Sequence, residues 1–172
     1  MAIDILALAN PGVRTLAPYV PGKPVEELER ELGIQGAIKL ASNENPLGPS
    51  PKALAAARAA LADIARYPDG GGFALKRALA AKLGVAMEQI TLGNGSNDIL
   101  EFAARAFVQP GDEVVYAQHA FAVYPIVTQA VGGRGVEVPA RAWGHDLEAM
   151  RRAITPRTRL VLINTPHNPT GR

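Results

Sequence analysis

The chain has 172 residues, which is long enough for one domain with a buried core. Hydrophobic residues make up 48% and charged residues 20%, the proportions of an ordinary soluble globular protein. The net charge is only +2, with no basic block, which argues against a nucleic-acid partner. The absence of cysteine excludes disulfides and thiolate metal sites. Because no transmembrane stretch and no basic signal-peptide region are found, we expect a cytoplasmic protein without a membrane partner.

The first 48 residues are interrupted by prolines and glycines and have little periodicity. One short helix is predicted over 25–32, and Gly33 is placed to end it. Residues 36–41 are apolar enough for a short strand. The segment 1–48 is therefore expected to be an arm that lies across another surface.

Regular patterning begins at Ser50. Ser50 and Pro51 form a strong helix start, because Ser can accept from unpaired backbone N–H groups and Pro is tolerated at the first helical position. This helix is predicted to continue to about Arg66, and a second over 73–83 is predicted to end at Gly84. After it, strands at 89–92, 113–117, 135–138 and 159–163 alternate with helices at 97–107, 122–131 and 146–154.

The last predicted strand is apolar at four consecutive positions, 160–163. A strand covered on both faces by helices has this pattern, as in a parallel sheet. Together with the alternation of strands and helices, it predicts an α/β architecture. Ligands in such sheets bind beyond the carboxyl ends of the strands.

Residues 91–98, Thr-Leu-Gly-Asn-Gly-Ser-Asn-Asp, combine a strand end, a glycine-rich turn and a helix start. This combination favours phosphate, because backbone N–H groups and the positive end of the helix dipole meet there. The segment is neither a P-loop nor a dinucleotide fingerprint, since no Gly-Lys-Ser/Thr follows and Asp98 replaces the third glycine. A plain helix cap made by Ser96 or Asn97 is the alternative.

Residues 164–171, Asn-Thr-Pro-His-Asn-Pro-Thr-Gly, directly follow the last predicted strand. Two prolines and a glycine restrict the loop around Asn168 and direct a short amide to the strand end, although a generic turn would use the same residue types. The isomer of the Asn168–Pro169 bond stays open. His119, His145 and His167 have no metal-ligand spacing and are interpreted as structural or solvent-facing.

Five motifs together resemble the fold-type I aminotransferases that depend on pyridoxal 5'-phosphate. Each motif alone is weak, but their order and spacing are specific. The first two, with the Gly-rich residues after the second, are most similar to histidinol-phosphate aminotransferases. The motifs are Asn-Glu-Asn-Pro-Leu-Gly (43–48), Arg-Tyr-Pro-Asp (66–69), Gly-Asn-Gly-Ser-Asn-Asp (93–98), Pro-Gly-Asp-Glu-Val (110–114) and His-Asn-Pro-Thr-Gly (167–171).

The resemblance implies an α/β fold-type I transferase in which 1–48 form the arm and part of a small domain. Residues 49–172 would then form an incomplete large cofactor-binding domain with a mostly parallel sheet flanked by helices. It also implies that the strand at 89–92 is separated from the other three by strands contributed later in the chain. We therefore expect residues 1–172 alone to be poorly stable.

The resemblance also assigns roles to residues of the cofactor site. Gly95, Ser96 and Asn97 would bind the cofactor phosphate, and Tyr67 would reach the phosphate in the partner of a homodimer. Asn168 would hydrogen-bond the phenolic oxygen of the pyridine ring, favouring its charged form. Phe121 stands where the family has an aromatic ring, commonly tyrosine, stacked on the cofactor; an ordinary core position is the alternative.

Two further residues would contact substrate by the same resemblance. Tyr19, in the arm, would enter the partner's site, with a packing anchor as the alternative, and Asn45 would line the substrate site. No catalytic residue is assigned within the chain, because the Schiff-base lysine of the family lies beyond a position equivalent to Arg172. All five lysines precede the Asn-Pro-Thr-Gly loop, so the 172 residues alone are expected to be inactive.

The implied reaction moves an amino group between L-histidinol phosphate and 2-oxoglutarate, giving imidazole acetol phosphate and glutamate, in histidine biosynthesis. Two alternatives stay open. One is another fold-type I enzyme, either an aromatic aminotransferase or a phospho-amino-acid decarboxylase. The other is a non-catalytic phosphate-binding α/β module.

Overall fold

The computed structural model describes residues 4–172 and divides the chain into two compact units. The first combines the amino-terminal residues up to Tyr19 with Thr91–Arg172, and the second is Val20–Ile90. Within residues 4–172, no helix is both long and apolar enough to cross a membrane. The boundary predicted near residue 48 concerns a complete enzyme and stays a prediction.

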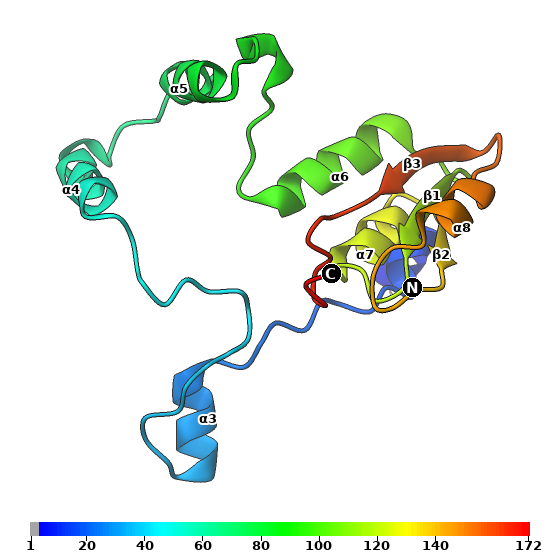
Figure 1. The fold of residues 1–172 in the computed structure, drawn as a ribbon, viewed down its shortest axis with the longest axis horizontal. Helices are drawn as coiled ribbons and strands as arrows, with labels where there is room; N and C mark the ends of the chain where they lie inside the picture. Colours follow the sequence, from blue (N-terminus) through cyan, green and yellow to red (C-terminus); the bar gives the residue numbers. More distant parts are fainter. Residues whose placement is uncertain (1–3) are drawn as a thin grey trace. The chain divides into compact units, whose positions relative to one another are not determined.

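The first unit is a three-stranded parallel sheet with helices on both faces (Figure 1). Its strand order is β2-β1-β3, so the first strand in sequence lies in the centre. The elements in chain order are α1 (Ile5–Leu8), α2 (Pro11–Arg14), α6 (Ser96–Phe107), β1 (Glu113–Ala117), α7 (Val123–Ala130), β2 (Arg134–Val138), α8 (Leu147–Arg152) and β3 (Thr158–Leu162).

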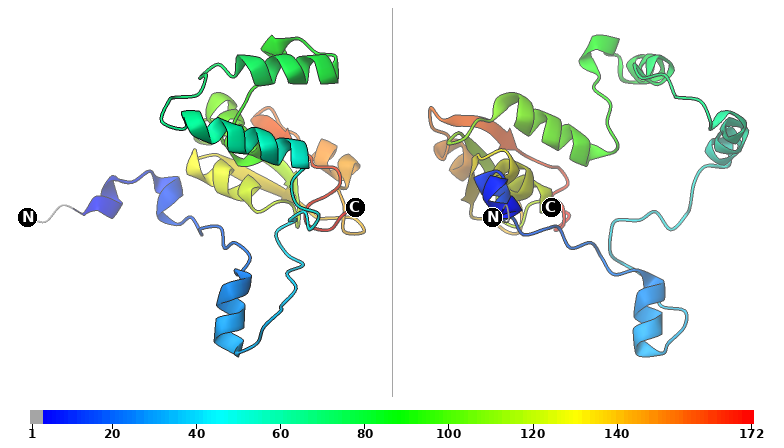
Figure 2. Two further views of the ribbon diagram at one scale, coloured as in Figure 1. Left: turned by 90° about the vertical axis from the view of Figure 1, so that its left-hand side faces the viewer. Right: turned by 180° about the vertical axis from the view of Figure 1, so that it is seen from behind.

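All five residues of the central strand β1 are buried. Val114 and Tyr116 pack with Tyr124 of α7 on one face of the sheet. Val115 and Ala117 alternate with them and pack with Met150 of α8 on the other face. The two further views of the ribbon show the same layers (Figure 2). Helices therefore cover β1 on both sides, as a parallel sheet requires.

A buried carboxylate joins the three strands at the amino end of β1. Glu113 is fully buried, and its Oε1 accepts hydrogen bonds from Arg134 at 2.7 Å and Arg157 at 2.8 Å. Its Oε2 accepts from the Thr155 hydroxyl at 2.6 Å. Hydrogen bonds from Thr155, Arg157 and Arg134 lower the pKa of Glu113 to about 2. Because Arg134 begins β2 and Arg157 precedes β3, one side chain ties both neighbours to β1.

The amino-terminal helices α1 and α2 are not predicted from the sequence, because the prolines interrupt the periodicity by which a helix is recognised. Each is a single turn, and the N-caps are Asp4 and Asn10. The α2 segment lies against α7. A Cβ at Gly12 would come within 2.0 Å of the Gln129 carbonyl oxygen, and the Gln129 amide donates to Thr15 at 3.1 Å. Close approach of the two backbones therefore requires glycine at position 12.

The second unit contains short helices joined by extended segments. They are α3 (Val25–Leu32), α4 (Pro51–Ala60), the 3-10 turn η1 (Leu61–Asp63), α5 (Phe73–Leu83) and the 3-10 turn η2 (Met87–Gln89). The predicted ends at Gly33 and Gly84 are confirmed, with φ of 63° and 69°. Ser50 is the N-cap of α4, but its side chain makes no capping hydrogen bond.

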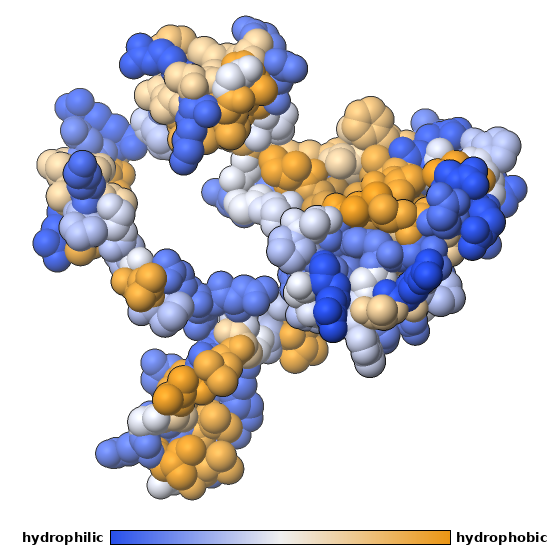
Figure 3. All heavy atoms as spheres, in the orientation of Figure 1, coloured by the Kyte–Doolittle hydropathy of each residue, from blue (hydrophilic) through white to orange (hydrophobic). Residues whose placement is uncertain are grey.

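No residue between 20 and 90 is buried. Around α3, Leu32, Ile38 and Leu40 lie at the surface, and the space-filling view shows apolar side chains there (Figure 3). Helices of 8–11 residues are marginal in water without packing. This unit therefore has no hydrophobic core of its own.

Three predictions about strands are wrong. Residues 36–41 and 89–92 form no strand, and η2 occupies the start of the second segment. A strand needs a hydrogen-bonded neighbour, and neither segment has one among residues 4–172. The last strand, β3, is not covered on both faces either: Leu160 and Leu162 pack against the core on one face, whereas Val161 on the opposite face is 40% exposed.

Replacing Glu113 by glutamine should lower the melting temperature of the full-length protein and flatten its dependence on acid pH. The folded-state pKa of about 2 lies below the ordinary 4.5, so the ionised carboxylate stabilises the fold above pH 4.5. That stability should be lost as the pH falls from 4.5 toward 2. Thermal unfolding between pH 2 and 7 measures both effects.

Glu148→Gln is the matched control, because Glu148 is exposed and pairs only with Arg151 in the next turn of α8. Such surface pairs contribute little to stability. An acid profile of Glu113→Gln that overlays the native profile would contradict the assignment of Glu113 as the tie between strands.

Candidate functional site

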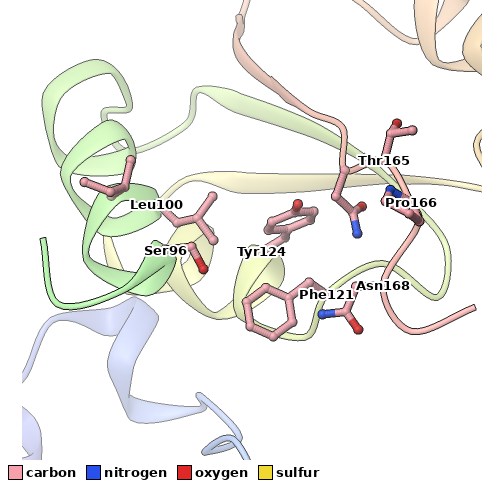
Figure 4. Close-up of a pocket in the computed structure, with 9 residues that line it drawn as sticks. Ser96, Leu100, Phe121, Tyr124, Thr165, Pro166 and Asn168 are labelled. Carbon is pink, nitrogen blue, oxygen red and sulfur yellow. The ribbon is translucent and has the colours of Figure 1, made fainter. Parts of the chain in front are cut away.

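A cavity of about 420 Å³ lies in the first unit. Helix α6 and the start of α7 form one wall, and the loop after β3 forms the other (Figure 4). Its lining residues are Ser96, Ile99, Leu100, Phe121, Tyr124, Asn164, Thr165, Pro166 and Asn168. None of them is charged, so any charge on a ligand must be balanced by backbone dipoles or by groups outside this set.

The start of α6 is shaped for an anion. Gly95 is the N-cap with φ 82° and ψ 178°, a conformation essentially reserved for glycine. It provides no capping side chain, so the first N–H groups of α6 are left for another acceptor. Ser96 is the first helical residue rather than the cap. The alternative in which Ser96 or Asn97 caps the helix is therefore wrong.

The turn before α6 is braced from within. The Asp98 carboxylate accepts from the Asn94 backbone N–H at 2.8 Å and from the Asn94 amide at 3.2 Å. A Cβ at Gly93 would come within 2.7 Å of the Asp98 Cβ. Asp98 therefore holds the glycine-rich turn in place, and Gly93 leaves room for it.

Two aromatic rings form the apolar part of the cavity wall. Phe121 and Tyr124 meet edge to face, with centroids 6.0 Å apart. Phe121 also packs against the hydrophobic core, so its core role and its exposure to the cavity coexist. Burial raises the pKa of the Tyr124 hydroxyl, which keeps it protonated at neutral pH.

The loop after β3 contributes two amides. In Figure 4 the side chain of Asn168 extends toward the Phe121 ring, and the Asn168–Pro169 and Thr165–Pro166 bonds are both cis. Asn164, the other amide, lines the same cavity. Neither its Oδ1 nor its Nδ2 has a hydrogen-bond partner within residues 4–172. A buried amide without partners is costly, which makes Asn164 a candidate to bind a ligand.

Two histidines lie together beside this loop. The rings of His145 and His167 meet edge to face with centroids 4.5 Å apart. His167 is buried, so of the two interpretations from the sequence the structural one holds for it. Burial, followed by the nearby His145 and His119, lowers the pKa of His167 below its ordinary 6.5. Among residues 4–172, no group of acidic or histidine side chains is arranged to hold a metal.

The structure brings together three of the residues singled out from the sequence: Ser96, Phe121 and Asn168. Gly95 adjoins them as the N-cap, and Asn97 is exposed in the first turn of α6 without lining the cavity.

The other three predicted residues are not among the lining residues. Tyr19 is half exposed at the end of its unit, and Tyr67 is fully exposed in the second unit. The Asn45 side chain accepts from the Leu47 N–H at 3.0 Å and lines a separate hollow of about 380 Å³ formed by residues 38–46.

Sequence reasoning missed Tyr124 and Asn164. Tyr124 follows Phe121 by three residues, a spacing that places two side chains on one face of a helix. Asn164 follows the apolar run 160–163 directly, at the carboxyl end of a strand where ligands bind. Both signals were present in the sequence, but neither is specific without the fold.

The family model for aminotransferases of class I and II matches residues 35–172. Histidinol-phosphate aminotransferase 2 of Pseudomonas fluorescens is 65% identical over 99% of this chain and 47% of its own length. The chain thus spans about half the length of the curated relatives that it matches.

Solved structures show the same fold. Histidinol-phosphate aminotransferase from Sinorhizobium meliloti, in complex with pyridoxal-5'-phosphate, superposes with a TM-score of 0.84 at 31% identity, covering 98% of this chain and 44% of that one. N-succinyldiaminopimelate aminotransferase from Mycobacterium tuberculosis superposes with a TM-score of 0.73 at 35% identity, covering 86% and 41%. The predicted α/β transferase fold is confirmed.

Inorganic phosphate should raise the melting temperature of the full-length protein, and Gly95→Ala should reduce this effect. Alanine at the φ and ψ of Gly95 costs about 1–3 kcal/mol and would shift the N–H groups that face the cavity. Gly111→Ala is the control, because Gly111 also has a positive φ, of 92°, and open space for a Cβ, but lies between α6 and β1 and not at the start of α6. Thermal scans with phosphate or chloride at equal ionic strength measure the difference. An equal loss of the phosphate effect in both variants would contradict an anion site at α6.

Proposed function

Because the chain belongs to the class I and II aminotransferases, we propose that it forms part of a pyridoxal-phosphate-dependent histidinol-phosphate aminotransferase. The proposed reaction transfers the amino group of L-histidinol phosphate to 2-oxoglutarate, giving imidazole acetol phosphate and glutamate. It is a step of histidine biosynthesis, for which a cytoplasmic location is expected.

The 65% identity to a histidinol-phosphate aminotransferase over 99% of the chain carries the substrate assignment. Structural likeness alone is less selective, since aminotransferases with other substrates superpose with TM-scores of 0.73 and 0.75. Their identities, 35% and 31%, are about half as high. The substrate proposal therefore rests on the sequence comparison, whereas the fold fits many aminotransferases.

One end of the cavity suits the phosphate of a phosphorylated aromatic cofactor, and the other end suits its ring. The uncapped start of α6 offers N–H groups and a positive dipole end to a phosphate. Between the Phe121 ring and the two loop amides, an aromatic ring would find apolar contact and hydrogen-bonding groups. The unpartnered buried amide of Asn164 is the specific sign that a polar ligand group completes the site.

Each residue of the site then has a distinct task. Gly95, Ser96 and Asn97 would bind the phosphate, and Phe121 would pack on the ring. The Asn168 amide would donate to the phenolic oxygen, which favours the ionised oxygen and lowers its pKa. Pyridoxal phosphate itself would supply an electron sink for the negative charge that develops on the substrate.

No residue that lines this cavity is a lysine. All five lysines lie between residues 23 and 82, before the Asn-Pro-Thr-Gly loop, whereas the family resemblance places the Schiff-base lysine after that loop. We therefore assign the Schiff-base lysine to a part of the enzyme outside residues 1–172. The 172 residues alone would bind phosphate weakly and would not catalyse the transfer.

A homodimer is part of the proposal. The second unit has no buried residue, so its helices need a surface from elsewhere to cover their apolar side chains. Tyr67 projects fully exposed between α4 and α5, which is compatible with a contact to the partner's cofactor phosphate. Tyr19 and Asn45 would contact the substrate.

No observation favours the alternatives considered for the sequence. An aromatic aminotransferase or a phospho-amino-acid decarboxylase would use the same cofactor residues, and comparing substrates in one assay separates them. A non-catalytic phosphate-binding module agrees poorly with a family match over residues 35–172.

Asn168→Ala should weaken binding of pyridoxal phosphate by the full-length enzyme. Loss of one hydrogen bond to a charged oxygen costs about 1.5–3 kcal/mol, or roughly tenfold to more than a hundredfold in affinity. Asn10→Ala, which removes an amide from the N-cap of α2, is the control and should keep native affinity. Cofactor titration by absorbance measures the affinity.

The native full-length enzyme should prefer histidinol phosphate to aspartate and phenylalanine in kcat/KM. A coupled assay with each amino donor measures this preference. A preference for another donor would reject the substrate assignment.

Mixing the variants Tyr67→Ala and Asn168→Ala, at a cofactor concentration too low to load either variant alone, should restore activity if Tyr67 acts across the dimer interface. A heterodimer of Tyr67→Ala and Asn168→Ala would carry both defects in one site and leave the other site native. Random exchange of subunits makes half of the dimers heterodimeric, so about one quarter of native activity should return. If Tyr67 and Asn168 instead serve the same subunit's site, every site stays defective and mixing restores nothing.

A further inference from the structure

Hydrogen bonds made by two histidines that do not line the cavity restrain the loop that carries Asn164 and Asn168. His145 Nε2 lies 2.9 Å from the Asn164 carbonyl oxygen. Within the loop itself, His167 Nδ1 lies 2.9 Å from the Thr170 hydroxyl oxygen, which in turn donates to the Trp143 carbonyl outside the loop. Neither histidine lines the cavity, so neither would touch the cofactor or substrate directly.

The hydrogen bonds fix which ring nitrogen of each histidine carries the proton. A carbonyl oxygen can only accept, so the 2.9 Å contact with the Asn164 carbonyl assigns the proton of His145 to Nε2, in preference to the longer 3.4 Å contact in which Nε2 would accept from the Asn164 N–H. The Thr170 hydroxyl donates its single proton to the Trp143 carbonyl. It must therefore accept from His167, which is protonated at Nδ1.

The remaining nitrogens are buried. His145 Nδ1 and His167 Nε2 have no hydrogen-bond partner within residues 4–172. A second proton on the buried His167 ring would place a charge against the His145 ring, whose centroid is 4.5 Å away. The lowered pKa of His167 agrees with a ring that is neutral at neutral pH.

The acceptor for Thr170 lies in an unusual turn. Residues 141–144 form a tight turn closed by hydrogen bonds between Arg141 and Gly144 in both directions, at 3.1 Å and 3.0 Å. Ala142 and Trp143 have φ of 49° and 64°, a conformation uncommon for residues other than glycine. This turn directs the Trp143 carbonyl to Thr170 and leads directly into His145.

We propose that His145 and His167 are positioning residues: through the hydrogen bonds of opposite ring nitrogens they hold the loop 164–170, and with it the Asn168 amide, beside the cofactor site. This inference rests on the proposed function, since it assigns the pair to the binding of pyridoxal phosphate. The two rings act through different ends of the loop, at Asn164 and at Thr170. Together they fix the strand end and the loop end on either side of Asn168.

Amide replacements provide a test specific to each tautomer. The glutamine side-chain nitrogen substitutes for imidazole Nε2, and the asparagine nitrogen substitutes for Nδ1. His145→Gln and His167→Asn should therefore keep the hydrogen bond to the loop, whereas His145→Asn and His167→Gln should lose it. Each variant that keeps the bond is the matched control for the one that loses it. The side chain expected to keep the bond is glutamine at position 145 and asparagine at position 167.

Two properties of the full-length enzyme are measured: the dissociation constant of pyridoxal phosphate, and the pH midpoint of the absorbance change of the bound cofactor. His145→Gln and His167→Asn should stay close to native. His145→Asn and His167→Gln should bind the cofactor about tenfold more weakly or worse, as is typical when a supporting partner is lost. Their absorbance midpoint should move to higher pH, because a displaced Asn168 amide stabilises the ionised phenolic oxygen less.

The outcomes separate this inference from the proposed function. A native enzyme that shows no absorbance change with pyridoxal phosphate would overturn both. A native enzyme that binds the cofactor, with variants that lower the melting temperature but leave the absorbance midpoint unchanged, would overturn only the positioning role. The positioning role would also be overturned if glutamine were not the better replacement at position 145 and asparagine the better replacement at position 167. Should a His167 variant fail to fold, Thr170→Ser and Thr170→Val replace that pair, since serine keeps the hydroxyl that links His167 to Trp143 and valine removes it.

Discussion

The burial of β1 on both faces is the constraint on which the rest of the first unit depends. A parallel sheet needs helices on both faces, and β1, which pairs in parallel with β2 and β3, is covered in that way. Parallel strands end at the same edge of the sheet. The loops after β1 and β3 therefore meet, and Phe121 comes to face Asn168 although 47 residues separate them in the sequence. Glu113, at the opposite end of β1, holds the three strands in register by ionic hydrogen bonds instead of apolar packing.

Local signals in the sequence predicted the elements whose cause is local. Glycines that adopt a left-handed backbone ended α3 and α5 where expected, and proline opened α4. The strand 113–117 and its alternating helices follow from periodicity alone. The failures at 36–41 and 89–92 have one physical origin: apolar composition permits a strand, but only a neighbouring strand with unpaired N–H and C=O groups makes one. The exposure of Val161 has a different origin, because composition does not show whether a helix covers each face of a strand.

The candidate site was predictable in its parts and not in its assembly. Ser96 and Asn168 are predicted because they lie in glycine- and proline-rich turns at strand ends, which can be recognised in the sequence. Tyr124 and Asn164 enter the cavity because α7 and the loop after β3 face one another, a relation that no local pattern encodes. The histidines show the same limit. Their spacing, 22 residues apart, gives no sign that two rings stack edge to face.

The polar groups around the cavity divide into those that are satisfied and those that are not. The Asp98 carboxylate, the Thr170 hydroxyl and the protonated nitrogens of both histidines all have partners, and each of these bonds restrains a loop. The buried amide of Asn164 has no hydrogen-bond partner within residues 4–172, and the exposed start of α6 has no capping side chain. Leaving buried polar groups unpaired costs stability, so a fold keeps them only where something else pairs with them. A rigid frame with unpaired groups directed at one cavity is the arrangement expected of a preorganised binding site, in which the ligand meets groups already held in position.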